Sequence, residues 1–68
     1  MMAKSWDQIS SRWTRFSRDV KKKWGELTDD ELDQIAGKKD RLVGTLQEKY
    51  GIAKQEAEKQ ISEWERSL

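Results

Sequence analysis

The four glycines of this chain, together with its lack of proline, set the strongest limit on how it can fold. The glycines stand at positions 25, 37, 44 and 51, and apolar residues recur every three or four positions between them. That period places apolar side chains on one face of a helix, and a glycine after such a run commonly ends the helix. We therefore expect helices that end at Gly25, Gly37 and Gly51. Gly44 lies inside a helical pattern, which predicts that another helix crosses close to it.

Two capping boxes mark where the first two predicted helices begin. In a capping box, two side chains three residues apart satisfy backbone N–H groups of the first turn reciprocally. Ser5 and Gln8 fit this pattern for the first helix, and Thr28 and Glu31 fit it for the second. The first helix is expected to continue without interruption to Gly25. The second is expected to be only about two turns long, because the next glycine follows closely.

Two further helices are predicted in the second half of the chain. The third covers residues 38–50 and ends at Gly51, and the fourth runs from residue 53 or 54 to the C-terminus. The fourth helix begins without a Ser, Thr or Asp cap. The pattern as a whole predicts an all-α fold, a small bundle of about four helices.

The two halves of the chain are similar to each other. A shift of 26 residues aligns Lys23-Trp24-Gly25 with Lys49-Tyr50-Gly51 and Phe16 with Leu42. Beyond the glycines a shift of 25 aligns better, which implies a second turn that is one residue shorter. This approximate internal duplication predicts two tandem helix–glycine–helix hairpins. They must pack on each other, because neither hairpin can bury its apolar stripe alone.

Apolar residues are scarce in this chain, and nearly all of them lie on the predicted stripes. Charged residues make up 40% of the sequence, while Leu, Ile, Val and Phe together number 12 of 68, which is close to the composition of disordered chains. Four Trp and one Tyr add apolar area. The predicted core consists of Trp13, Phe16, Val20, Trp24, Leu27, Leu32, Ile35, Leu42, Leu46, Tyr50, Ile61 and Trp64. Ile9, Val43 and Ala57 lie on the same stripes.

The tryptophan-rich stripe of the first helix has two interpretations besides the core. A basic helix with Trp and Phe on one face can lie on a membrane surface or bind a partner helix. We favour the core, because a domain of 68 residues without disulfides needs those rings inside. An exposed Trp6 or Trp64 would instead indicate a surface for a protein partner. The sequence allows a monomer or a weak homodimer.

Composition excludes several classes of chemistry. The chain has no Cys and no His, which removes disulfides, thiolate nucleophiles, Cys-based zinc sites and the commonest general base. The acidic run at 29–33 lacks the spacing of a calcium loop, and the glycines form no phosphate-binding loop. We therefore predict no catalytic, cofactor-binding or metal site, and a protein that is not an enzyme.

The hydropathy pattern bears on location. No apolar run approaches the ~18 residues that an integral membrane helix needs. The first residues also lack the apolar stretch of a signal peptide. We therefore expect no integral membrane segment and a cytoplasmic location.

Charge is segregated along the chain although the net charge is only +1. Residues 1–25 carry seven basic and two acidic side chains, whereas residues 26–37 carry five acids and no base. Arg12, Arg15, Arg18 and Lys22 fall on or near one flank of the first predicted helix. We favour a solvated flank that complements the acidic segment within the domain. The alternative is a weak nucleic-acid contact, since a few basic residues give salt-sensitive phosphate binding.

Four motifs stand out along the chain: Trp13-x-x-Phe16, Trp24-Gly25-x-Leu27-Thr28-Asp29-Asp30, Gly37-Lys38-x-Asp40 and Leu46-Gln47-Glu48-x-Tyr50-Gly51. As a set they resemble the CsbD-like family of small bacterial stress-response proteins. The resemblance covers about residues 6–64 and implies a single domain over residues 1–68. Many family members carry Gly near position 18, where this chain has Arg18.

The resemblance also implies a fold and a role. It implies two crossed helical hairpins, similar to the SAM-like arrangement, and expression under general stress with no established biochemical activity. It transfers no catalytic or ligand-binding residue to this chain. We therefore expect a non-catalytic, protective or protein-binding stress-response protein.

Overall fold

A computed structural model describes residues 6–68, and within this range the chain forms five α-helices and no strand. The helices are α1 (Trp6–Ser11), α2 (Trp13–Lys23), α3 (Asp29–Ile35), α4 (Lys39–Tyr50) and α5 (Lys54–Ser67). The predicted all-α bundle is confirmed. The last two helices begin within a residue of the expected positions, and Ala53 precedes α5 without a side-chain cap.

The first predicted helix is interrupted, which is why the structure has one helix more than expected. Arg12 separates α1 from α2 with φ −120° and ψ 38°, outside helical geometry. The break redirects α1, and the Trp6 indole then donates a hydrogen bond of 2.7 Å to the carbonyl of Gly37. No proline or glycine stands at the break. We therefore attribute the break to the tertiary contacts that α1 makes. The predicted cap Ser5 lies outside the described residues.

Of the three glycines expected to end helices, two adopt the left-handed backbone. Gly51 ends α4 with φ 61°, as predicted. Gly37 has φ 77°, but it follows Ala36, which is itself left-handed with φ 51° and caps α3 one residue earlier than expected. The prediction for Gly25 is wrong, because its φ lies outside the left-handed region. The chain leaves α2 already at Trp24, with φ −122° and ψ 83°.

The close backbone approach expected at Gly44 occurs instead at Gly37. A Cβ added to Gly44 would meet no atom within 4 Å, so no helix crosses there. A Cβ on Gly37 would lie 2.9 Å from Oγ of Ser10 and 3.1 Å from its Cα. Gly37 is therefore needed both for its left-handed backbone and for the contact with α1.

The start of α3 follows the predicted capping box. The backbone N–H of Glu31 donates to Oγ1 of Thr28 at 3.2 Å, and the N–H of Thr28 donates to Oε1 of Glu31 at 2.9 Å. The flanking Leu27 and Leu32 are both buried. These local contacts matter most for α3, because a helix of seven residues has little stability of its own.

The interior consists of apolar side chains from all five helices and from the segment between α2 and α3. The buried residues are Ile9, Phe16, Val20, Trp24, Leu27, Leu32, Ile35, Leu42, Val43, Leu46, Ala57, Ile61 and Trp64. Two residues of the predicted core differ. Trp13 is only partly buried, and Tyr50 is 38% exposed, because its hydroxyl reaches out to accept the backbone N–H of Glu26.

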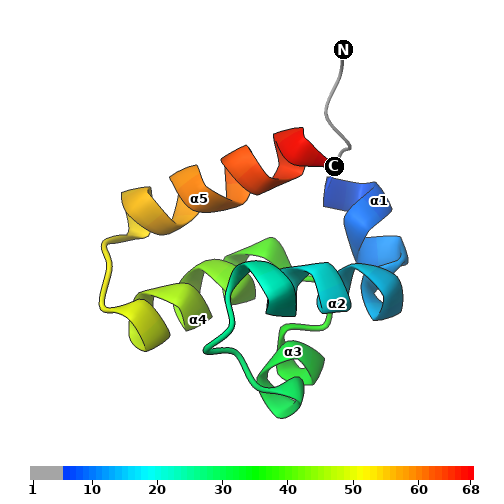
Figure 1. The fold of residues 1–68 in the computed structure, drawn as a ribbon, viewed down its shortest axis with the longest axis horizontal. Coiled ribbons are helices and arrows are strands. Elements are labelled where there is room, and N and C mark those ends of the chain that lie inside the picture. Colours follow the sequence, from blue (N-terminus) through cyan, green and yellow to red (C-terminus); the bar gives the residue numbers. More distant parts are fainter. Residues whose placement is uncertain (1–5) are drawn as a thin grey trace.

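Five aromatic rings pack together in a cluster centred on Trp64. Figure 1 shows α4 and α5 as an antiparallel pair, with α1 close to the C-terminal end of α5. The ring of Trp64 lies 6.4 Å from Trp6, 6.4 Å from Phe16 and 5.8 Å from Trp24. Trp13 joins the cluster through Trp6 at 6.3 Å. Edge and tilted contacts at these separations stabilise aromatic pairs.

Candidate functional site

The strongest candidate for a functional surface is the outward side of α2 with the residue before it. We call Arg12, Arg15, Arg18 and Lys22 the basic face. All four side chains are exposed. Arg15, Arg18 and Lys22 are spaced by three and four positions within α2, so they share one side of the helix. Arg12 stands at the break between α1 and α2.

The opposite side of α2 is fixed to the core, and this determines where the basic face points. Phe16 and Val20 are buried on that side, and Trp24 follows the helix into the core. The Trp13 indole donates to the carbonyl of Leu32 at 2.9 Å. The Trp24 indole donates to Oε1 of Gln60 at 2.9 Å. These directional bonds hold α2 at two points, so the basic face is presented to solvent on a rigid support.

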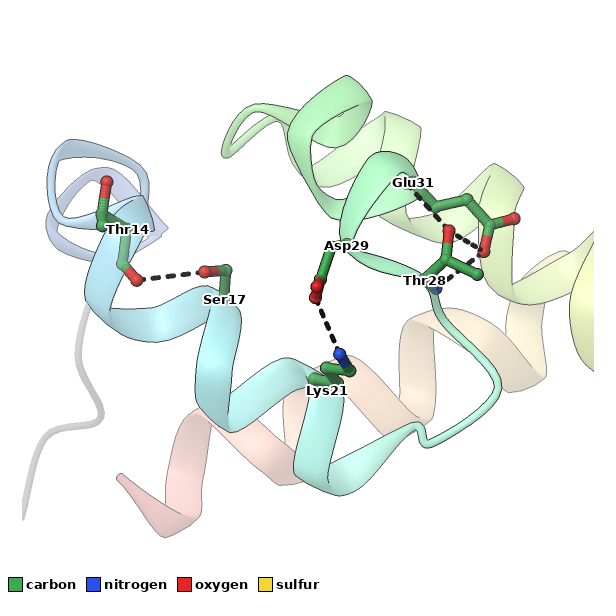
Figure 2. Close-up of polar contacts among 6 residues, drawn as sticks. All are labelled: Thr14, Ser17, Lys21, Thr28, Asp29 and Glu31. Atoms are coloured by element: carbon green, nitrogen blue, oxygen red, sulfur yellow. Dashed lines mark hydrogen bonds and ion pairs between the residues drawn. The ribbon is translucent and has the colours of Figure 1, made fainter.

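The acidic helix α3 takes its basic partners from elsewhere. Nζ of Lys21 lies 2.7 Å from Oδ1 of Asp29, and Figure 2 shows this ion pair joining α2 to the start of α3. Nζ of Lys49 on α4 lies 3.1 Å from Oε2 of Glu31. Lys21 projects from the side of α2 that faces α3 and is not part of the basic face.

The basic face makes no ion pair with any residue that the structure describes. Among residues 6–68, ion pairs join Lys21 with Asp29, Lys39 with Glu65, and Lys49 with Glu31. The complementarity expected between the basic flank and the acidic segment is therefore provided by Lys21. The four predicted residues keep their charges directed to solvent.

The acidic cluster at the start of α3 has a structural explanation. A backbone hydrogen bond from Thr28, assisted by Lys49, lowers the pKa of the Glu31 carboxyl. Asp29 is paired with Lys21. In the described part of the chain, no three Asp or Glu side chains are grouped closely enough to hold a metal ion. The cluster thus acts at the positive end of a helix dipole.

Two open hollows lie on the side of α4 that carries Gly44. One, of about 660 Å³, lies between α3 and α4 and is lined by Asp33, Arg41 and Glu48 among others. The other, of about 470 Å³, lies between α4 and α5 and includes Lys39. Their walls carry both signs of charge, and Gly44 borders both. They offer no cluster of like charge comparable to the basic face.

Comparison with known proteins places this architecture in a family. The family model described as CsbD-like matches residues 7–59, most of the chain. The chain belongs to the CsbD-like family. A UPF0337 protein of Pectobacterium atrosepticum, ECA0631, is 51% identical over 59 residues, which cover 87% of this chain and 86% of the relative. UPF0337 protein YjbJ of Escherichia coli K12 is 48% identical, with the same coverage of both chains.

A third relative extends the range of sources. UPF0337 protein NE2439 of Nitrosomonas europaea is 47% identical over 57 residues, which cover 84% of this chain and 61% of the relative. None of these three names states a reaction, a ligand or a partner. Within residues 6–68 of the CsbD-like chain, no helix is long and apolar enough to cross a membrane.

Sequence reasoning identified the basic face of this CsbD-like domain but missed which cation would pair with α3. A helical projection separates Lys21 from Lys22 by about 100°, but it does not say which of the two faces α3. It also missed the indole bonds of Trp6 and Trp13 to backbone carbonyls of α3 and the following turn. Those bonds join residues far apart in sequence, and no local pattern specifies them.

Proposed function

We propose that this chain is a non-catalytic, cytoplasmic protein of the general stress response that acts through its hydrophilic exterior, by protecting or binding other proteins. The single observation that carries the proposal is the aromatic cluster. Trp24 and Trp64 are buried, and Trp6 and Trp13 pack against the core. With the rings used inside, the outer surface is dominated by charge.

The distribution of charge supports the same proposal. All thirteen buried core side chains are apolar, and none of the described charged or polar residues is buried. The lowered pKa of the Glu31 carboxyl is explained by its role in the helix cap. Catalytic groups with perturbed pKa values are typically set in clefts beside a specific charge partner. A compact apolar core inside a charged shell is better suited to action by surface contact.

A protection assay tests this proposal directly. A heat-labile dehydrogenase is warmed with increasing molar ratios of the chain, and its light scattering and residual activity are followed. We expect aggregation to slow and activity to be retained as the ratio rises. Serum albumin at equal mass is the control for simple crowding. Protection no better than albumin, or turnover of a defined small molecule by the purified chain, would contradict the proposal.

A second candidate function has its own supporting observation. The basic face carries four exposed cations that make no ion pair among the described residues. Unpaired Arg and Lys side chains on one rigid surface are typical of phosphate contact. We therefore carry weak nucleic-acid binding as the alternative, tested by titration with nucleic acid at two salt concentrations.

A further inference from the structure

We propose that the basic face binds the phosphate backbone of double-stranded nucleic acid, without reading its sequence and in preference to single strands. The inference rests on the second candidate function and specifies its ligand. The positions of four cations and of the aromatic rings support it.

The spacing of the cations fits a polyanion. Arg15 and Lys22 are seven positions apart, so they span about 10 Å of helix axis at 1.5 Å per residue. A DNA duplex carries one negative charge per about 1.7 Å of its axis, so about six phosphate charges lie along that length. Phosphates of a duplex are therefore spaced closely enough to meet more than one cation of the basic face. Three of the four are Arg, whose guanidinium can bind phosphate oxygens in a bidentate manner.

The cations are available without loss of an internal contact. Within residues 6–68 none of the four takes part in an ion pair, so phosphate binding breaks none. Asp19, the acid of α2, is partly buried beside this face and reduces its net charge by one. The remaining excess of positive charge favours weak, salt-sensitive binding.

The opposite side of α2 argues against a membrane as the ligand. An amphipathic helix binds a lipid surface by inserting its apolar side. Here that side is occupied, since Phe16 and Val20 are buried and Trp24 bonds to Gln60. Lipid insertion would require α2 to leave the core. Phosphate binding by the basic face requires no change in the fold.

The placement of the aromatic rings favours a duplex over a single strand. Proteins that bind single strands stack bases on exposed aromatic side chains beside a basic groove. Five rings of this chain, those of Trp6, Trp13, Phe16, Trp24 and Trp64, belong to the cluster on the core side. Tyr50 is exposed, but it lies on α4 and its hydroxyl is bonded to the N–H of Glu26. The basic face thus offers charges without a stacking platform.

The test measures binding to a fluorescently labelled 20-base-pair DNA duplex of random sequence by anisotropy. With three to four phosphates neutralised, affinity should fall about 40- to 150-fold between 50 and 200 mM salt, from a slope of about −0.9 per phosphate. The double variant Arg15→Gln/Arg18→Gln should bind more weakly at 50 mM salt and lower that slope by about 1.8. Arg15→Lys/Arg18→Lys should preserve the slope, because it keeps both charges.

A matched control separates the basic face from net charge. Lys54 and Lys59 are exposed on α5 and make no ion pair among the described residues, so Lys54→Gln/Lys59→Gln removes the same charge elsewhere. This control should bind like the parent chain. Thermal melts establish that both double variants fold, as their exposed positions lead us to expect.

Several outcomes would overturn the inference. They are no duplex binding at 50 mM salt, equal weakening in both double variants, tighter binding of a single strand, or tighter binding of anionic phosphatidylglycerol vesicles. The dehydrogenase assay contains no nucleic acid. Failure here therefore leaves the protective proposal intact, and failure there leaves this inference intact.

Discussion

The two copies of the repeat, α2–α3 and α4–α5, carry the same Lys–aromatic–Gly sequence where their first helix ends, and they use it in different ways. In the second copy Tyr50 remains helical and Gly51 takes the left-handed conformation. In the first copy the chain leaves the helix at Trp24, which is buried, and Gly25 needs no special backbone. The helix thus ends at the aromatic residue where that ring is buried, and one residue later where the ring is exposed.

The starts of the second helix in each copy of the repeat differ as well. Thr28 and Glu31 form a full capping box for α3, whereas Ala53 at the matching position gives α5 no side-chain cap. The capped helix has seven residues and the uncapped one has fourteen. The side-chain cap is therefore found on α3, the helix whose short length gives it little stability of its own. The longer α5, which has a buried apolar stripe, forms without such a cap.

The largest expected effect separates the two aromatic residues. Trp24→Ala should lower the free energy of unfolding by about 3–5 kcal/mol, because it empties a core position and removes the bond to Gln60. Tyr50→Ala should lower the free energy of unfolding by only about 1–2 kcal/mol, since the Tyr50 side chain is partly exposed and contributes little to the core. Urea unfolding followed by circular dichroism measures both. Equal losses would show that the two rings play equivalent roles.

The two glycines should respond to alanine with opposite signs. Gly51→Ala should destabilise by about 1 kcal/mol, because alanine disfavours the left-handed backbone. Gly25→Ala should be neutral or stabilise by about 0.4–1 kcal/mol, since its backbone is not left-handed and its Cβ would meet no atom within 4 Å. Thermal denaturation of the pair provides the measurement. A loss at both positions would contradict the difference between the turns.

The repeat also aligns Gly44 of α4 with Arg18 of α2. Glycine has no side chain, whereas arginine has a long one. Gly44→Ala should stabilise the domain by about 1 kcal/mol, because a Cβ there meets no atom and alanine favours the helix. The midpoint of urea unfolding should rise with an unchanged slope. A lower midpoint would mean that Gly44 is needed for packing after all.

The smallest effect concerns the capping box, which α3 has and α5 lacks. Because the pKa of Glu31 is lowered in the folded chain, its stabilising contribution is complete above the ordinary value of 4.5 and is lost as pH falls through the lowered value. Unfolding measured between pH 7 and pH 2 should therefore show a gap between the parent chain and Glu31→Gln that closes below about pH 4.5. A gap that persists at low pH would point to steric rather than ionic stabilisation.

Local sequence signals predicted much of this fold, and their failures share a cause. The Thr28 capping box and the Gly51 stop depend on residues within one turn of the chain, and both are confirmed. The break at Arg12 and the close approach at Gly37 depend on contacts between α1 and a turn far along the sequence. Periodicity carries no information about such contacts.

The candidate site divides in the same way. Helical spacing predicted that Arg15, Arg18 and Lys22 share one side, and the structure places them there with their side chains exposed. Which cation meets α3 depends on how α3 is positioned against α2, and the structure gives that role to Lys21. Tertiary geometry, absent from the sequence pattern, leaves the basic face without an ion-pair partner among residues 6–68.

The aromatic cluster has a consequence for how the protein is made. Its central ring, Trp64, is contributed by α5, while Trp6, Phe16 and Trp24 are synthesised long before it. The cluster can close only after Trp64 has emerged from the ribosome. Until then the earlier rings lack their contacts with Trp64, and exposed apolar surface of this kind favours aggregation of incomplete chains.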